Sequence, residues 1–204
     1  MLKPTVYLID DDPDIRSYLQ KLLESVDVHT KDFGSAQEFL DAGLNDQPAC
    51  LVVDVRLPRI SGLELLKILR SNGHQIPAIV LTGHADVGVA VRAMKLDVVD
   101  FLEKPVNEHL FLDAINQALK KAEEIWLNRR RRAEAHDKLA SLTDRERDVL
   151  NLLVTGKSHK AIAAELGISP KTLSIHRTHI RAKLNTDNLV DMGCLLRHVA
   201  DEDD

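Results

Sequence analysis

Short apolar runs rich in β-branched residues alternate with helically spaced segments through the first half of the chain. Five runs predict strands, at residues 5–9, 26–30, 49–54, 78–82 and 98–102. Apolar residues recurring every three or four positions predict helices at residues 13–25, 35–42, 61–71, 86–95 and 108 onward. This alternation predicts an α/β fold, a doubly wound five-stranded parallel sheet with helices on both faces. The central strands are apolar throughout, as strands covered on both sides must be.

A polar stretch rich in helix formers follows, from about residue 120 to 141, and we expect it to form a helical linker. It contains four consecutive arginines, Arg129 to Arg132. This run is either a phosphate-binding arm or, as charge runs more often are, a solvated helix face.

Clean helix signals come after the linker. Thr143 and Glu146 form a capping-box pattern, and Gly156 ends the helix that they begin. Ser169 precedes Pro170 at the start of another helix, where the missing N–H of proline costs nothing. Four helices are predicted, at residues 143–155, 158–166, 170–183 and 188–200. We therefore expect a first domain at residues 1–120, a helical linker at 121–138 and an all-α helix-turn-helix domain at 139–204.

The composition is that of an ordinary globular protein. Hydrophobic residues make up 44% of the 204 residues and charged residues 29%, which excludes a collagen-like or largely disordered chain. Aromatic residues make up 3%, too few for a protein that stacks single-stranded bases. No membrane span or secretory signal is visible, and Cys50 and Cys194 lie outside any zinc or disulfide pattern. We expect a cytoplasmic protein without membrane contact.

Charge divides unevenly along the chain. Residues 1–119 hold 11 basic and 18 acidic side chains, whereas residues 120–204 hold 16 basic and 14 acidic ones. An acidic front and a basic back suggest two domains with different partners.

Carboxylates gather where two predicted strands end. Asp10, Asp11 and Asp12 directly follow the first strand, and Asp54 ends the third. In a doubly wound sheet, such strand ends open the ligand crevice at the switch point in strand order. Carboxylates brought together there repel one another unless a hard cation such as Mg²⁺ neutralises them. A metal-dependent phosphate site is therefore predicted, although Asp12, next to Pro13, is better explained as a helix cap.

Two more residues complete this set. Thr82 ends the fourth strand, and Lys104 follows the fifth within the string Phe-Leu-Glu-Lys-Pro at 101–105. With this five-part spacing, residues 4 to about 120 resemble the receiver domain of response regulators, which has a flavodoxin-like fold. The resemblance implies that Asp54 is the nucleophile that accepts a phosphoryl group from a sensor histidine kinase.

The same resemblance assigns the metal ligands. Asp11 and Asp54 would ligate Mg²⁺ directly, together with the backbone carbonyl of Arg56, and Asp10 would act mainly through water. Lys104, joined to the next proline by a cis bond, would pair with the acyl phosphate. Metal and lysine together would offset charge on the transferring oxygens, which is most of what phosphoryl transfer requires.

The resemblance also implies a switch. Phosphorylation adds about −1.5 to −2 charges, and Thr82 would be drawn to the phosphoryl group while Phe101 turns inward, a population shift between existing states. Val91 and Lys95 would then lie at a dimer contact. For Phe101, a plain role as a core aromatic is an equal alternative.

The chain departs from the receiver pattern in places. Asp97 stands in a turn where related receivers often have glycine, so the exit of the preceding helix is expected to differ. Arg56 and His84 lie two residues after Asp54 and Thr82. Their side chains either set the rate at which water removes the phosphoryl group or are merely exposed.

The helices at 158–166 and 170–183, joined by a short turn, have the proportions of a helix-turn-helix. In the second helix, the apolar members of one stripe must pack inward, and that stripe consists of Leu173, Arg177, Ile180 and Leu184. A second stripe is polar and largely exposed, and consists of Lys171, Ser174, Ile175, Thr178 and Arg181. Residues 156–185 hold six basic residues and one acidic residue, a balance suited to DNA phosphates, although ordinary helical bundles share such patterns.

Three strings carry a second resemblance: Leu-Thr-Asp-Arg-Glu-Arg-Asp-Val-Leu (142–150), Gly-Lys-Ser-His-Lys-Ala-Ile-Ala (156–163) and Leu-Gly-Ile-Ser-Pro-Lys-Thr-Leu-Ser-Ile-His-Arg (166–177). They are similar to the LuxR/NarL-type output domain over residues 139–200. With a receiver before it, the whole chain resembles FixJ-type response regulators.

By matching positions, the second helix would read duplex DNA. Ser174, Ile175 and Thr178 would face base edges in the major groove, with Ile175 suited to a thymine methyl group. His176 is expected to pack or to contact backbone, and His159 departs from the asparagine common at its position. Phosphate contacts are expected from Lys160, Lys171, Thr172, Arg177, Arg181 and Lys183. The last helix, with Leu189, Met192, Leu195, Leu196 and Val199, would form a dimer contact on DNA, complete the core, or do some of both.

These observations predict a two-component transcriptional regulator that is not a conventional enzyme: it phosphorylates itself from phosphohistidine, dephosphorylates slowly, forms a homodimer and binds promoter DNA. RNA polymerase is a further candidate partner. One alternative is a Mg²⁺-dependent phosphohydrolase, but haloacid-dehalogenase-type enzymes need an aspartate where this chain has Arg56. Another is a phosphorylation-independent DNA binder with a vestigial pocket.

Overall fold

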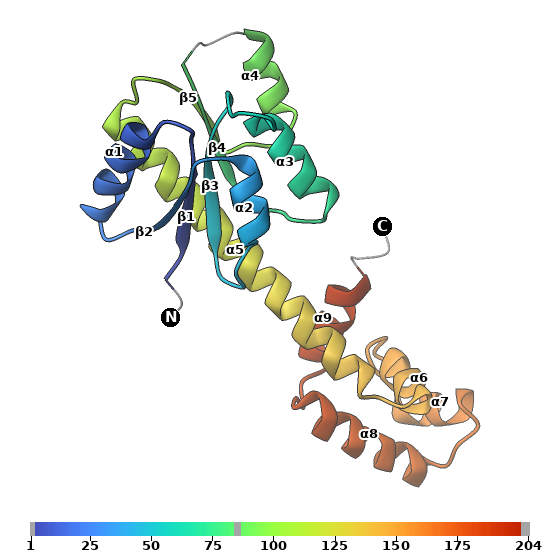
Figure 1. Ribbon diagram of the computed structural model, residues 1–204. Coiled ribbons are helices and arrows are strands. Elements are labelled where there is room, and N and C mark those ends of the chain that lie inside the picture. The colour runs from blue at the N-terminus through green and yellow to red at the C-terminus, as the bar shows by residue number, and fades with distance from the viewer. Residues whose placement is uncertain (1–2, 84–86, 201–204) are drawn as a thin grey trace. The chain divides into compact units, whose positions relative to one another are not determined.

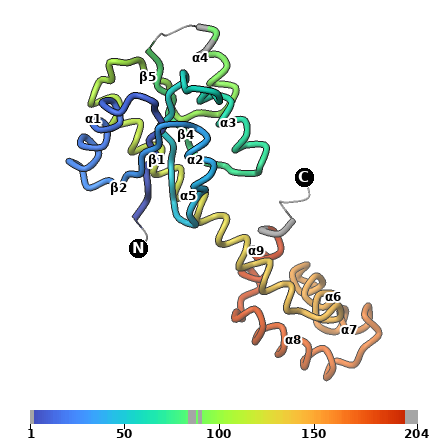
Figure 2. Tube along the Cα trace, viewed as in Figure 1, coloured from blue at the N-terminus to red at the C-terminus, as the bar shows by residue number. Residues whose placement is uncertain are grey.

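The chain divides into two compact units. The computed structural model describes residues 3–83 and 87–200, and the division falls between Leu127 and Asn128. That point lies within a single long helix, α5 (Glu108–Ala140), which contributes residues to both units (Figures 1 and 2). The predicted linker, residues 121–138, therefore lies inside this helix. None of the helices in the described part of the chain combines the length and apolar character needed to cross a bilayer.

The first unit is built on a five-stranded parallel sheet. Its strands are β1 (Thr5–Ile9), β2 (His29–Phe33), β3 (Ala49–Asp54), β4 (Ala78–Thr82) and β5 (Asp100–Glu103). Their order across the sheet is β2-β1-β3-β4-β5. The order reverses at β1, so the crevice of this fold lies where β1 and β3 end. The predicted doubly wound α/β fold is confirmed.

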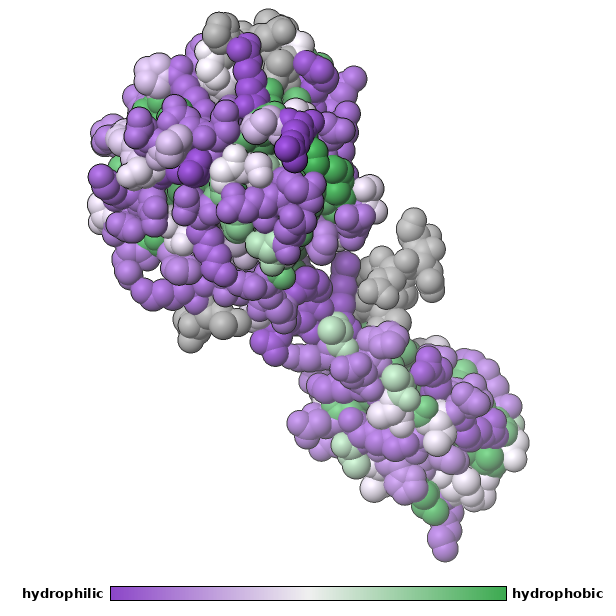
Figure 3. Space-filling model, viewed as in Figure 1, coloured by the Kyte–Doolittle hydropathy of each residue, from purple (hydrophilic) through white to green (hydrophobic). Residues whose placement is uncertain are grey.

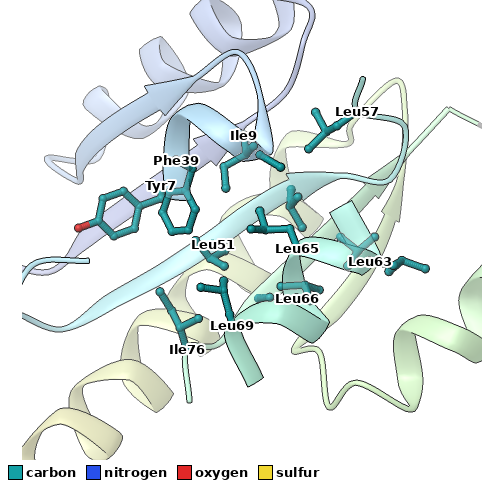
Figure 4. Close-up of a cluster of buried hydrophobic side chains, with 14 of the residues drawn as sticks. Tyr7, Ile9, Phe39, Leu51, Leu57, Leu63, Leu65, Leu66, Leu69 and Ile76 are labelled. Atoms are coloured by element: carbon teal, nitrogen blue, oxygen red, sulfur yellow. The ribbon is translucent and has the colours of Figure 1, made fainter. Parts of the chain in front are cut away.

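Helices cover both faces of this sheet (Figure 1). They are α1 (Pro13–Glu24), α2 (Ala36–Ala42), α3 (Gly62–Ser71), α4 (Val87–Met94) and α5. Alternate strand residues feed two separate cores, because successive side chains of a strand point to opposite faces. Tyr7, Leu51 and Val80 join the α2 and α3 core, where Tyr7 lies against Phe39 (Figure 4). Their strand neighbours join the core under α1 and α5.

Two strands begin later than their apolar runs predicted. The strand predicted at 26–30 was placed too early in the chain, since β2 starts at His29 and pairs from Thr5↔His29 onward. Val26 is exposed and Asp27 has a positive φ of 58°, so both lie in the turn after α1. The strand predicted at 98–102 likewise begins at Asp100 as β5. Pairing with a neighbouring strand determines the residue at which β2 and β5 each begin. The pattern of apolar residues does not reveal this pairing.

The second unit is helical, as predicted. After the end of α5 it contains α6 (Asp144–Leu153), α7 (His159–Glu165), α8 (Pro170–Leu184) and α9 (Leu189–Ala200). Side chains of Leu150, Ile162 and Ile180 meet in its core. The capping box is present in full: Thr143 Oγ1 accepts from the Glu146 N–H, and the Glu146 carboxylate accepts from the Thr143 N–H.

Candidate functional site

The predicted acidic set gathers at the carboxyl ends of β1 and β3. Ile9 pairs with Val53 at the end of the ladder, so the residues that follow emerge side by side. Ligand-capable oxygens of Asp10, Asp11 and Asp54 all lie within 4.8 Å of one another. Asp10 and Asp54 are buried, at 2% and 6% exposure, while Asp11 is exposed. Asp12 stands apart from this cluster as the cap of α1, and its Oδ1 accepts from the Asp14 N–H at 2.9 Å.

Lys104 completes the pocket from the end of β5. Its Nζ lies 2.6 Å from Asp10 Oδ2 and 3.3 Å from Asp54 Oδ2. Its backbone N–H donates to the carbonyl of Thr82 at 2.7 Å, which joins the ends of β4 and β5. The bond from Lys104 to Pro105 is cis, as the family resemblance implied. The Thr82 side chain is itself buried, at 1% exposure.

The charges in this pocket do not balance. Burial, the leading influence, raises the pKa of Asp10, although the hydrogen bond from Lys104 and the Asp12 N–H oppose that shift. Asp54 Oδ1 is buried and accepts no hydrogen bond within the described residues. Among the described residues, Lys104 pairs with two of the three clustered carboxylates, those of Asp10 and Asp54. An all-oxygen donor set with an unsatisfied buried oxygen fits a hard divalent cation such as Mg²⁺.

Two residues that the sequence reasoning missed shape this pocket. Gly62 opens α3, and a Cβ atom built there would lie 2.1 Å from the backbone oxygen of Asp54. Only glycine therefore allows α3 to approach the end of β3 so closely. Arg16 donates to the carbonyl of Asp10 at 2.7 Å and to Asp32 Oδ2 at 3.0 Å, which anchors the acidic loop to β2. In the sequence, only two features could have pointed to these roles: Gly62 directly follows Ser61, and Arg16 lies four residues after the last of the three aspartates.

The remaining predicted residues of this unit lie around the pocket and α4. Arg56 is exposed, and His84 lies outside the described residues. Phe101 is half-buried and packs against the α2 and α3 core. The dimer candidates Val91, in α4, and Lys95, just after it, are exposed.

At the exit of α4, where the sequence led us to expect a difference from a glycine turn, the backbone takes a conformation that glycine also adopts. Asp97 takes a positive φ of 49°, a conformation that glycine adopts without cost. Two contacts support it: Arg70 donates to the carbonyl of Asp97 at 3.4 Å, and Lys121 Nζ lies 3.1 Å from Asp97 Oδ2.

In the second unit, α8 exposes a polar stripe, and hydrophilic side chains cover much of the visible face of the unit in Figure 3. Leu173, Ile180 and Leu184 are buried as predicted. Ile175 is 49% exposed, an apolar side chain on an otherwise polar surface. The exposed members of the predicted DNA set are Lys160, Lys171, Ser174, Ile175, Thr178, Arg181 and Lys183, and Thr172 and Arg177 are half-buried.

Several of these predicted phosphate contacts have partners inside the protein. Arg177 lies 3.3 Å from the ring nitrogen of His159, and Thr172 Oγ1 lies 2.8 Å from Ser169 Oγ at the helix cap. Arg181 forms an exposed ion pair with Asp187 at 3.1 Å, an arrangement that contributes little and breaks easily. Lys183 differs, because its partner is a buried carboxylate.

That carboxylate belongs to Glu146, which is 3% exposed. The hydrogen bond from Lys183 and the Thr143 N–H together lower its pKa to about 2. Sequence reasoning found Glu146 as half of a capping box and missed its contact with α8, since 37 residues separate it from Lys183.

The last helix serves the core at some positions and is exposed at others. Met192 is buried, and Leu195 and Leu196 pack against the core of this unit. Leu189 and Val190 are 47% and 67% exposed. The side chain of Val199 lies outside the described set.

Comparison with known proteins assigns both units. The family model of the response regulator receiver domain matches residues 6–116, and that of the bacterial regulatory proteins of the luxR family matches residues 140–196. The transcriptional regulatory protein FixJ of Azorhizobium caulinodans is 43% identical over 98% of this chain and 95% of its own length. The response regulator protein TodT of Pseudomonas putida is 37% identical over 92% of this chain and 82% of its own length.

Solved structures agree with these matches. A low-resolution structure of the response regulator StyR has a TM-score of 0.87 and 39% identity, and the match covers 96% of this chain and 99% of that one. Full-length FixJ from B. japonicum has a TM-score of 0.57 and 38% identity, with 98% of each chain covered. Both likenesses extend across the two units.

Proposed function

The chain belongs to the response regulators that join a receiver domain to a LuxR-family output domain, and from this membership we propose that Asp54 accepts a phosphoryl group and that α8 then reads duplex DNA. It is a two-component response regulator that controls transcription. The receiver implies a histidine kinase as partner, and the output domain implies DNA.

One observation carries the assignment of Asp54. Its Oδ2 lies beside Lys104 Nζ, while its Oδ1 is buried and accepts no hydrogen bond within the described residues. An oxygen without a donor keeps its lone pairs for a cation or for attack on phosphorus. The new bond joins a carboxylate oxygen of Asp54 to phosphorus as the nitrogen–phosphorus bond of the kinase phosphohistidine breaks, and the freed imidazole takes up a proton.

Asp11 and Asp54 would hold Mg²⁺ directly, together with the backbone carbonyl of Arg56, and Asp10 would act mainly through water. The bound ion would supply positive charge to the phosphoryl oxygens. Lys104 supplies the second positive charge, and its ion pair with Asp10 keeps the ammonium in place before transfer. Positioning and charge neutralisation are the main demands of this reaction.

The signal then leaves the pocket through Thr82 and Phe101. Thr82 turns toward the phosphoryl oxygens, and Phe101, half-buried against the core, fills the space behind it. The resulting change reaches the exposed α4 face, where Val91 and Lys95 join two receivers in a homodimer. RNA polymerase is a further partner of the assembled dimer.

In the output domain, α8 enters the major groove. Ser174, Ile175 and Thr178 face base edges, and the exposed Ile175 meets a thymine methyl group. Phosphates are held by Lys160, Lys171, Thr172, Arg177 and Arg181. Two such helices in a dimer predict a target with two half-sites related by a dyad.

Selection of genomic fragments tests this proposal. The full chain is incubated with fragments of its source genome in Mg²⁺, with and without beryllofluoride as a stand-in for phosphorylated Asp54, and bound DNA is sequenced. Discrete dyad sites enriched mainly with beryllofluoride are the expected result. The Asp54→Asn protein is the matched control and should enrich the same sites equally weakly in both conditions.

Two outcomes contradict the proposal. If no fragment is enriched in either condition, the DNA-binding assignment is wrong. If both proteins enrich the same sites equally, DNA binding does not depend on phosphorylation and the pocket is vestigial. Rapid hydrolysis of many phosphomonoesters would instead indicate the phosphohydrolase alternative.

A further inference from the structure

Glu146 connects two helices of the output domain through one buried carboxylate. Its Oε2 accepts from the Thr143 N–H at 2.9 Å and from Lys183 Nζ at 2.7 Å. Its Oε1 lies 3.5 Å from His179 Nδ1. Thr143 and Glu146 belong to the start of α6, whereas His179 and Lys183 lie on α8. A single side chain thus caps one helix and holds the other.

The position of Lys183 on α8 separates it from the stripe that faces DNA. Five residues separate it from Thr178, a rotation of about 140° around a helix of 3.6 residues per turn. Arg181 is three residues from Thr178, a rotation of about 60° in the other direction. Lys183 and His179 lie four residues apart on one flank, next to the buried Ile180. That flank is the one that meets α6.

The ion pair of Lys183 also differs from that of Arg181 in its surroundings. Arg181 and Asp187 have side chains 46% and 82% exposed, so water replaces either partner readily. The carboxylate paired with Lys183 has a side chain 4% exposed. Moving the ammonium to a DNA phosphate would leave a buried charge without its main partner, which is strongly unfavourable.

We propose that Glu146 is a positioning residue for DNA recognition, which holds α8 against α6 through Lys183. Lys183 therefore binds the buried carboxylate of Glu146 and not the DNA backbone. This inference rests on the proposed function, because it assumes that α8 reads duplex DNA. It removes Lys183 from the phosphate contacts that the sequence predicted and keeps Arg181 among them.

Salt dependence distinguishes the two roles. Each phosphate contact contributes about 0.9 to the slope of log affinity against log salt concentration. With duplex DNA from the genomic selection, Lys183→Met in the full chain should weaken binding about tenfold at every salt concentration, with the slope unchanged. Arg181→Gln, the matched control on the same helix, should lower the slope by about one.

Rescue provides the second readout. Glu146→Gln keeps the shape and the capping acceptor but removes the charge that Lys183→Met leaves unpaired. In the double variant, DNA affinity should return to within about threefold of the wild type, because the pair acts as a unit. A lysine that contacts phosphate gives no such rescue.

Chemical labelling of the wild type avoids any folding defect in the variants. Acylation followed by peptide mass mapping should modify Lys183 slowly in the free protein, with no further protection when DNA is added. Lys171, exposed on the DNA-facing stripe, should react quickly and become protected. Protection of Lys183 by DNA, or a slope reduced by one without rescue, overturns the inference alone. A wild type that binds no DNA overturns the proposed function and, with it, the role in recognition.

Discussion

Each unit of this protein contains a buried carboxylate paired with a lysine, and the two pairs have opposite balances. In the receiver, three carboxylates lie together, and Lys104 pairs with two of them, those of Asp10 and Asp54. In the output domain, one carboxylate, that of Glu146, has a lysine, a backbone N–H and a nearby histidine. The distances are alike, 2.6 Å and 2.7 Å from lysine nitrogen to carboxylate oxygen.

The pKa shifts of the two carboxylates also differ in sign. Burial dominates at Asp10 and raises its pKa, whereas hydrogen bonds dominate at Glu146 and lower its pKa to about 2. A group of carboxylates with too little positive charge nearby favours binding a cation or taking up a proton. A carboxylate whose negative charge is already paired favours neither change. The same residue types therefore make a pocket suited to a cation in one unit and, by our proposal, a fixed connection in the other.

The largest expected effect comes from exchanging the carboxylate at the centre of each site. Asp54→Asn should abolish phosphoryl uptake completely, because an amide cannot form the acyl phosphate. Glu146→Gln should leave uptake unchanged, since its carboxylate serves only the output domain. Incorporation of labelled phosphoryl from a small-molecule donor in Mg²⁺ measures both. Comparable uptake by the Asp54→Asn protein would show that another side chain is the acceptor.

Removing the lysine of the pocket should have a smaller but large effect. Lys104→Met keeps the length of the side chain and deletes its charge, so the transferring oxygens lose one stabilising donor. Loss of one such preorganised donor reduces a rate by roughly 10²-fold to 10³-fold. Rapid-quench measurement of phosphotransfer at saturating Mg²⁺ is the test. A rate within about threefold of the wild type would assign the neutralisation to the metal alone.

The next effect in size concerns the backbone beneath Asp54. In Gly62→Ala, the new methyl group would lie 2.1 Å from the Asp54 backbone oxygen and 2.8 Å from Val53 Cγ2. Helix α3 must shift, at a cost of about 1–3 kcal/mol in the free energy of unfolding. Thermal unfolding of the full chain should show a lower unfolding temperature for the receiver and an unchanged one for the output domain. Gly73→Ala, at a glycine with a positive φ of 78° and no neighbouring atom within 4 Å, is a control for backbone strain without a clash.

Local signals predicted much of this molecule. Asp10 and Asp54 directly follow or end apolar strands, and parallel strands bring such ends together, so the pocket followed from the sequence. The Thr143–Glu146 capping box is also local and was found. Lys183 approaches Glu146 only after α6 and α8 pack, and Gly62 matters only because β3 lies beneath it. These features depend on distances across the fold, which no pattern of neighbouring residues encodes.

The smallest expected effect is a pH dependence confined to the output domain. The pKa of Glu146 is lowered from 4.5 to about 2 in the folded protein. Between these values the unfolded chain binds more protons than the native one, so its stabilising contribution is full above pH 4.5 and is lost as the pH falls towards 2. Urea unfolding monitored by amide signals of α6 and α8 should show midpoints that decline over this range. In Glu146→Gln the decline should be shallower. Equal slopes in both proteins would mean that Glu146 titrates as an ordinary exposed carboxylate, and the contrast between the two sites would then rest on geometry alone.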